Sequence, residues 1–363
     1  MEACVTLTIR DVRVRTVRLS PEQPVETASG VLRSTPLVLI DLLTEEGVTG
    51  RAYLRCYTSV ALQPLARLVA DLGPLIKGDA AAPAAIEQKL RRHFLLLGPQ
   101  GLVGMALAGI DMAAWDALAQ ACGLPLVTLL GGAPRPVPAY ASLRSMSPDV
   151  AAAEAEAVLA LGVAAIKVKV GRGDLDVDLE TIRAVRRAVG DDIALMVDYN
   201  QSLSVAEAIR RVSVLDGEGL YWIEEPTRSD DYAGHARIAE AARTAVQLGE
   251  NCWGAHDVAK MIASGASDHV TLDVMKLGGV TGWLRAAALV EPAGLPASSH
   301  TFPECSAHLL GVTPTCHWLE YLDHAGPILA EPIRIQDGHA FIPDRPGSGL
   351  DWNEDAVRRV LTR

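Results

Sequence analysis

The sequence predicts an α/β fold, a modified TIM (β/α) barrel with an α+β capping domain formed by the N-terminal region and the C-terminal tail. Between about residue 140 and residue 322, short apolar or β-branched runs alternate with longer segments of helical periodicity. Three runs end near a carboxylate, Asp198, Glu224 and Glu250, in equal steps of 26 residues. That step is about the length of one strand–helix unit in a parallel barrel, so all three should project from the same rim.

Eight runs have the length and composition of barrel strands. They cover residues 138–142, 164–170, 193–200, 221–226, 246–251, 269–274, 296–301 and 317–322. The segments between them, such as 148–162 and 178–190, repeat apolar residues every three or four positions and are predicted helices. Eight strands alternating with helices indicate a closed parallel barrel whose active site lies at the carboxyl ends of the strands.

The N-terminal region has a different pattern. Residues 7–19, 35–47 and 51–57 are strand-like and predict an antiparallel sheet, and residues 102–123 predict a helix. The tail after about residue 323 again shows strands and turns. A closed barrel leaves no place for it, so we expect it to return to the cap. The expected organisation is a cap over residues 1–135, a barrel over 136–323 and a C-terminal return over 324–363.

Composition excludes several classes of protein. The formal net charge of −11 and the lack of a Lys/Arg run argue against nucleic-acid binding. The apolar stretches, such as residues 103–110, fall short of the roughly 18 residues of a membrane-spanning helix. The start lacks the features of a signal peptide. We therefore expect a cytoplasmic protein whose six scattered cysteines, Cys4 included, are reduced thiols.

The three spaced carboxylates predict a metal site. A single acidic residue at a strand end is usually a helix cap or a solvated charge. Three carboxylates in register on adjacent strands favour the binding of a hard cation. Because all the ligands are oxygens, they indicate Mg²⁺, with Mn²⁺ possible, rather than zinc. Alternation along the strand allows only one of Glu224 and Glu225 to face the rim, and the pattern by itself does not choose between them.

Acid–base residues surround this site. Lys167 and Lys169 are one residue apart, so they share a face, which in a barrel can be the interior. Crowding there would lower the pKa of at least one of them. Asp273 and His300 end successive strands and could touch, which would fix the imidazole tautomer. Glu320 ends the eighth strand, where its simplest alternative role is a salt bridge.

Other polar residues of the same strands have weaker signals. Asn200 shares the face of Asp198 and could donate to a substrate oxygen. Lys276 follows the sixth strand, where a supporting role is as reasonable as a direct one. Asp111 and Trp115 have helical spacing, which is typical of packing residues.

These residues together resemble the mandelate racemase subgroup of the enolase superfamily. The resemblance covers nearly the whole length and rests on the motifs GIDMAAWDAL, KVKVG, VDYNQSL, WIEEPT, GEN, MKLGGVTGW, SSH and HWLE. It implies Mg²⁺-dependent removal of the α-proton of a 2-hydroxy carboxylate through an enediolate intermediate, with racemisation as the expected outcome. Acid-sugar dehydration by the same residues is the alternative, and a non-catalytic binding barrel is the third possibility. A homo-oligomer is expected.

The resemblance also implies individual roles. Asp198, Glu224 and Glu250 become the metal ligands, which settles the choice within the IEEP motif. Lys169 and the His300/Asp273 pair become bases on opposite faces of the substrate. The resemblance further implies that Lys167 neutralises the substrate carboxylate and that Asn200 contacts the α-hydroxyl. Glu320, in its protonated form, would donate a hydrogen bond to the enediolate. An aspartate at position 273, where the muconate-lactonising subgroup has lysine, favours the racemase branch.

The residues expected around the rest of the substrate are less typical of that branch, where the wall is mainly apolar. The predicted substrate-binding residues are Val25, Ser29, Leu32, Arg55, Tyr57, Ser142 and Arg144, with Glu26 and Arg33 nearby. If the arginines face the pocket, a polar or second acidic group is favoured over a phenyl ring. If they turn outward or pair with Glu26, the apolar residues receive an aromatic group.

Overall fold

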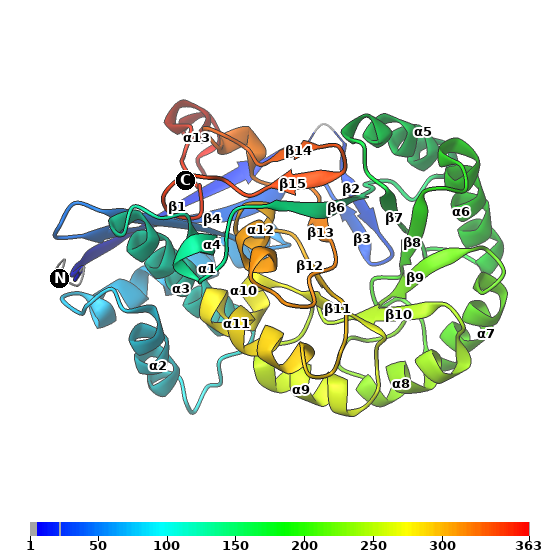
Figure 1. Cartoon of the computed structure of the whole chain (residues 1–363), viewed down its shortest axis with the longest axis horizontal. Helices are drawn as coiled ribbons and strands as arrows, with labels where there is room; N and C mark the ends of the chain where they lie inside the picture. Colours follow the sequence, from blue (N-terminus) through cyan, green and yellow to red (C-terminus); the bar gives the residue numbers. More distant parts are fainter. Residues whose placement is uncertain (1–5, 22, 363) are drawn as a thin grey trace.

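A ring of eight parallel strands with helices outside it forms one side of the molecule, and the cap lies on the other side (Figure 1). The computed structural model describes residues 6–21 and 23–362, so Cys4 lies outside the described residues. The barrel strands are β6 (Pro136–Ser142), β7 (Ala165–Lys169), β8 (Ala194–Asp198), β9 (Leu220–Glu224), β10 (Ala245–Leu248), β11 (His269–Leu272), β12 (Ala297–Ser299) and β13 (Leu319–Tyr321). All eight predicted strands are present.

The ring closes because β13 pairs in parallel with β6, placing Leu319 beside Ala139. On its other side, the backbone N–H of Ser299 on β12 donates to the carbonyl of Trp318 at 3.0 Å. The intervening helices are α5 (Pro148–Val158), the 3₁₀ turn η1 (Leu159–Leu161), α6 (Leu175–Val189), α7 (Val205–Leu215), α8 (Tyr232–Ala241), α9 (Ala255–Ala263), α10 (Val274–Leu277), α11 (Gly279–Val290) and α12 (Pro303–Gly311). The helix expected between the seventh and eighth strands is therefore formed.

Local sequence explains the ends of these helices. Helix α7 begins after Ser204, whose hydroxyl accepts from the backbone N–H of Glu207, in the Ser-x-x-Glu pattern of a capping box. Helix α6 has acidic residues in its first turn, Arg186 and Arg187 in its last, and ends at Gly190, whose φ is 79°. Each charge faces the end of the helix dipole that it stabilises.

Alternation along the strands divides the barrel interior into layers. On β7, Ile166 and Val168 belong to the core between strands and helices, whereas Ala165 packs inside the barrel with an aromatic floor. Tyr140 and Trp222 form this floor, with ring centroids 5.5 Å apart. One layer above it, Lys167 places its ammonium 5.4 Å from the centroid of the Tyr140 ring. The floor is apolar and the rim is charged, which places polar chemistry at the carboxyl ends of the strands.

The cap contains the predicted antiparallel sheet, in the order β1–β4–β5, together with three long helices and a small hairpin, β2–β3. Its elements are β1 (Ile9–Leu19), β2 (Val25–Thr27), β3 (Gly30–Leu32), β4 (Thr35–Thr44), β5 (Thr49–Arg55), α1 (Ser59–Ile76), α2 (Pro83–His93), α3 (Gly101–Ala121) and α4 (Leu126–Leu129). The fold is the predicted cap and barrel.

Helix α3 confirms the helix predicted over residues 102–123, and it extends well beyond the apolar stretch 103–110. It is the one helix of the described residues that is long and apolar enough to cross a membrane, but 83% of the relevant window is buried inside the protein. Its polar residues dock it onto α11. Asp111 accepts from the backbone N–H of Thr281 at 3.0 Å and from its hydroxyl, and Trp115 donates to the same hydroxyl at 2.9 Å. Helix α3 is the central helix of the cap, and its apolar length serves packing.

The C-terminal tail divides between the two parts of the molecule. The hairpin of β14 (Arg334–Gln336) and β15 (His339–Phe341) pairs antiparallel with the start of β6, so it extends the barrel sheet, contrary to expectation. This is possible because the first residues of β6 project beyond the closed ring. After η2 (Gly326–Ile328) and the hairpin, α13 (Glu354–Val360) contacts β1, and Trp352 donates to Asp41 of β4 at 2.7 Å.

Candidate active site

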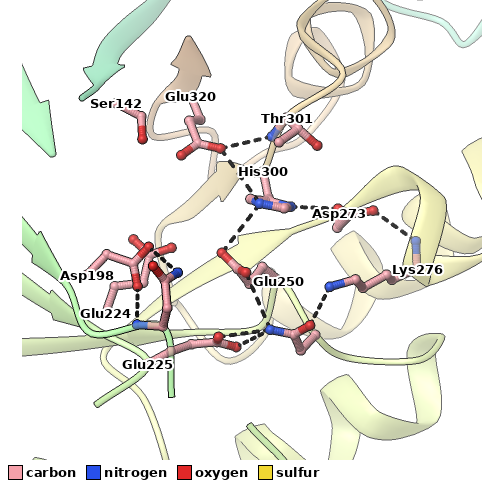
Figure 2. Close-up of polar contacts among 12 residues, drawn as sticks. Ser142, Asp198, Glu224, Glu225, Glu250, Asp273, Lys276, His300, Thr301 and Glu320 are labelled. Carbon is pink, nitrogen blue, oxygen red and sulfur yellow. Dashed lines mark hydrogen bonds and ion pairs between the residues drawn. The ribbon is translucent and has the colours of Figure 1, made fainter. Parts of the chain in front are cut away.

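Three carboxylates meet at the rim of the barrel (Figure 2). Asp198 ends β8, Glu224 ends β9 beside it in register, and Glu250 lies two residues beyond β10. One oxygen from each lies within 4.8 Å of the others, and all three residues are buried. Burial raises the pKa of Asp198 and of Glu224. Three crowded carboxylates of this kind form a donor set that fits a hard divalent cation.

Glu225 is excluded from this group by the backbone. Its φ is 37°, in the left-handed region, so the chain turns sharply after Glu224. Both Glu225 carboxylate oxygens accept from Asn251 Nδ2 at 2.8 Å, and the Asn251 amide oxygen in turn contacts the ammonium of Lys276. Glu225 is thus linked through Asn251 to Lys276, and Figure 2 shows these contacts.

Lys167 is enclosed by carboxylates. Its Nζ lies 3.0 Å from Glu224 Oε1, 2.9 Å from Glu320 Oε1 and 3.9 Å from Asp198 Oδ2, and the residue is 1% exposed. Burial lowers the pKa of Lys167, but Glu224 and Glu320 outweigh burial and leave the pKa well above its usual value. Lys167 therefore stays a cation at the base of the site.

The contacts of Glu320 favour its ionised form over the expected protonated one. Burial raises the pKa of Glu320, but Lys167 and His300 outweigh burial and hold the pKa well below its usual range. Its second oxygen accepts from the backbone N–H of Thr301 at 3.0 Å. Glu320 is the counterion of Lys167, a pairing that the closed ring creates because it brings β13 and β7 to either side of β6.

Lys169 differs from Lys167 although the two share a face of β7. Its Nζ donates to Leu143 O at 2.9 Å and to Ser142 Oγ at 3.2 Å, and within the described chain no carboxylate lies within 4 Å of it. Burial, together with the positive charge of Lys167, lowers the pKa of Lys169. A buried amine with a lowered pKa and a rim position can accept a proton.

His300 and Asp273 form the predicted pair. His300 Nδ1 lies 2.6 Å from Asp273 Oδ2, while its Nε2 lies 3.5 Å from Glu250 Oε2. Asp273 also caps α10 through the backbone N–H of Lys276 at 2.9 Å, which fixes the carboxylate. Burial lowers the pKa of His300, but the carboxylates of Glu250 and Asp273 outweigh burial and raise it. In the ring, β13 and β6 separate this histidine from the strand of Lys169.

Asn200 faces the site, and one N–H of its side-chain amide is bonded to a metal-site carboxylate. Nδ2 donates to Asp198 Oδ2 at 2.7 Å, and Oδ1 is buried without a partner among the described residues. Oδ1 can therefore accept a hydrogen bond from a substrate hydroxyl, and the second N–H of the amide is left for the predicted donation to a substrate oxygen.

A cavity of about 430 Å³ opens above these groups. Of the predicted substrate-binding residues, those that line it are Val25, Ser29, Leu32, Arg55 and Tyr57. Ser142 does not line the cavity, although it contacts Lys169. The placement of Arg144 in this pocket was wrong. Its guanidinium donates to the carbonyl of Asp323 at 2.9 Å, and it lines a different cavity, because the chain after β6 turns away from the rim.

Sequence reasoning missed several wall residues. Met105 comes from α3, Trp253 from the loop before α9, and Leu322 from just after β13. Thr27, Gln201 and Asn251 also line the cavity, as does Lys276, for which a supporting role was considered equally reasonable. Only the positions of Gln201, Asn251 and Leu322, each beside a barrel strand end, carried a sequence signal.

Family comparisons agree with this architecture. Residues 9–131 match the model described as "Mandelate racemase / muconate lactonizing enzyme, N-terminal domain", and residues 150–356 match "Enolase C-terminal domain-like". The chain therefore belongs to the enolase superfamily, in the mandelate racemase and muconate lactonizing enzyme family, and it is an enzyme.

Individual relatives differ in their activities. A crystal structure of an enolase from Bradyrhizobium, complexed with magnesium and mandelic acid, is 47% identical, with a TM-score of 0.95 over 99% of this chain and 100% of that one. The L-talarate/galactarate dehydratase of Salmonella typhimurium is 30% identical over 96% of this chain and 86% of its own. The 3,6-anhydro-alpha-L-galactonate cycloisomerase of Streptomyces coelicolor is 32% identical over 94% and 95%.

Proposed function

We propose that this protein is a Mg²⁺-dependent enzyme that removes the proton α to the carboxylate of a 2-hydroxy acid, with racemisation as the outcome. The observation that carries the proposal is the presence of two separate bases, Lys169 and the His300/Asp273 pair, beside one carboxylate cage. The magnesium in the Bradyrhizobium structure supports the choice of cation, and a small carboxylate ligand is present there too. We also propose a cytoplasmic homo-oligomer.

Each charged residue of the site has its own role in the proposed reaction. Asp198, Glu224 and Glu250 would hold Mg²⁺, which supplies positive charge to the substrate carboxylate and makes its α-proton more acidic. Lys167 adds a second fixed cation on the same side. Lys169, with its lowered pKa, takes the proton from one face. His300, held in one tautomer by Asp273, returns a proton from the other face and so inverts the carbon.

Acid-sugar dehydration is the second candidate function. His300 could act as an acid and expel a hydroxyl from the neighbouring carbon after Lys169 has removed the α-proton. The relation to the Salmonella dehydratase and the polar residues of the cavity favour this outcome. The product would be a 2-keto acid rather than the mirror-image substrate.

The test is deuterium exchange at the α-carbon of hydroxy acids and acid sugars in D₂O with Mg²⁺. We expect exchange by the wild type, and in His300→Asn we expect loss of inversion, by about 10²–10⁴-fold, with exchange of one enantiomer retained through Lys169. Lys169→Met should also lose inversion, and it should retain exchange of the opposite enantiomer through His300.

Two exposed residues provide matched controls, Lys77→Met and His93→Asn, which should behave as wild type. Inversion by His300→Asn, or full activity of Lys169→Met, would show that the bases are assigned wrongly. Activity that survives exhaustive chelation would show that the reaction does not depend on Mg²⁺.

A further inference from the structure

Arg55 is a buried cation with no countercharge. It ends β5, is 7% exposed and lines the cavity. Among the described residues its side chain has no hydrogen bond and no carboxylate within 4 Å, and its guanidinium carbon lies 4.7 Å from the centroid of the Tyr57 ring. An unpaired buried guanidinium is costly, so a partner is expected to come from outside the chain.

The neighbouring residues do not supply that partner. Glu26, the one sequence candidate, accepts from the backbone N–H of Met146 at 2.8 Å and from Ser145 at 3.0 Å, and its other oxygen lies 3.5 Å from Arg172. His324 has both ring nitrogens buried without partners in the described structure, and burial and the charge of Arg55 hold its pKa well below the usual value. It is therefore neutral.

A second cation adds to the positive charge of this wall. Lys276 places its ammonium 4.9 Å from the centroid of the same Tyr57 ring. The three carboxylates of the predicted metal site instead lie on β8, on β9 and after β10, and Glu320 on β13 is already paired with Lys167. The cavity is thus acidic where the cation would bind and basic at Arg55, and its volume of about 430 Å³ is within the range for small-molecule sites.

We propose that Arg55 binds a second carboxylate at the end of the substrate remote from the reacting carbon, which makes the substrate a hydroxy diacid. This inference rests on the proposed function, because it takes the first carboxylate to lie at the metal. A planar guanidinium pairs with a carboxylate through two parallel hydrogen bonds and so selects a diacid over an acid that ends in a hydroxymethyl group.

The test compares glucarate with gluconate, which differ only in the distal carboxylate. With Mg²⁺ present, kcat/KM for α-proton exchange and the dissociation constant by calorimetry are measured for wild type, Arg55→Met and Arg55→Lys. We expect wild type to favour glucarate by about 10- to 100-fold, Arg55→Met to lose this preference, and Arg55→Lys to keep part of it. The exposed Arg237→Met on α8 is the matched control and should retain the wild-type ratio.

The outcomes separate this inference from the proposed function. Exchange without preference for glucarate, or with mandelate as the best substrate, overturns the diacid subsite and leaves proton abstraction intact. Preferential glucarate binding that depends on Arg55, without any exchange, supports the subsite and overturns the proposed function. If neither acid binds, the diacid subsite is overturned, and proton exchange with mandelate then decides whether the proposed function stands.

Discussion

Glu224 and Glu225 are neighbours in the sequence but have different environments. The carboxylate of Glu224 lies beside those of Asp198 and Glu250 and forms an ion pair with Lys167. Glu225 instead points towards Asn251 because its own backbone is in the left-handed region. The two side chains have the same chemistry, so their difference in role comes from direction alone.

Substitution of each glutamate by glutamine tests this difference. Glu224→Gln should weaken Mg²⁺ binding by more than about 100-fold, because loss of a ligand exceeds the 10- to 100-fold effect usual for a supporting residue. Glu225→Gln should stay within that smaller range, since its amide can still bond with Asn251. Calorimetric titration with Mg²⁺ measures both, and equal losses in the two variants would contradict the assignment.

Helices α3 and α11 join the cap to the barrel through Asp111. Its carboxylate accepts two hydrogen bonds from Thr281, and Gly279 leaves room for it, since a Cβ there would lie 2.3 Å from Asp111 Oδ2. Burial nevertheless raises the pKa of Asp111 to about 7. The helix junction therefore contains a carboxyl group that is easier to bury when protonated.

The stability of this junction should depend on pH. The pKa of Asp111 is raised on folding from 3.8 to about 7, so the unfolded chain loses the proton first, and stability falls as pH rises through this interval. Asp111→Asn removes the titration. Its free energy of unfolding relative to wild type should rise by about 1.4 kcal/mol per pH unit between pH 4 and 7 and then level off.

Chemical or thermal unfolding of both proteins at several pH values measures this difference. The exposed Asp191→Asn is the control, and its difference from wild type should stay flat. A flat profile for Asp111→Asn would show that Asp111 is ionised throughout.

At the scale of the whole molecule, the site belongs to both parts of the chain. The barrel supplies the carboxylates and bases, while β2, β3, β5 and α3 of the cap supply Val25, Leu32, Arg55 and Met105 to the cavity wall. Under the proposed function, different segments would contribute the chemistry and the selection of substrate, which would allow one barrel to serve different activities.

A cation bound at the rim should stabilise the entire fold. At a Mg²⁺ concentration 100 times the dissociation constant, binding adds about 2.7 kcal/mol to the free energy of unfolding. For a chain of 363 residues we expect a rise in Tm of about 3.5 °C. Asp198→Asn, which removes a ligand, should show little response. Differential scanning calorimetry with Mg²⁺ or with chelator measures this, and identical Tm values for wild type would contradict the metal site.

Much of the barrel could be predicted from the sequence because its signals are local. Strand alternation placed Lys167 and Lys169 on one interior face, and the equal spacing of Asp198, Glu224 and Glu250 brought three carboxylates to one rim. Repeating strand–helix units place equivalent residues at equivalent heights, so spacing in the chain becomes proximity in space. The contact between Asp273 and His300 followed from the same regularity.

Only the tertiary structure decided the features that join distant segments. The turn at Glu225, the pairing of Glu320 with Lys167, and the outward direction of Arg144 depend on neighbours that no local pattern specifies. The β14–β15 hairpin joined β6 because an unpaired strand end was available there. Arg55 is buried without a countercharge because cap and barrel close over it, and burial of this kind is a property of the assembled fold rather than of the local sequence.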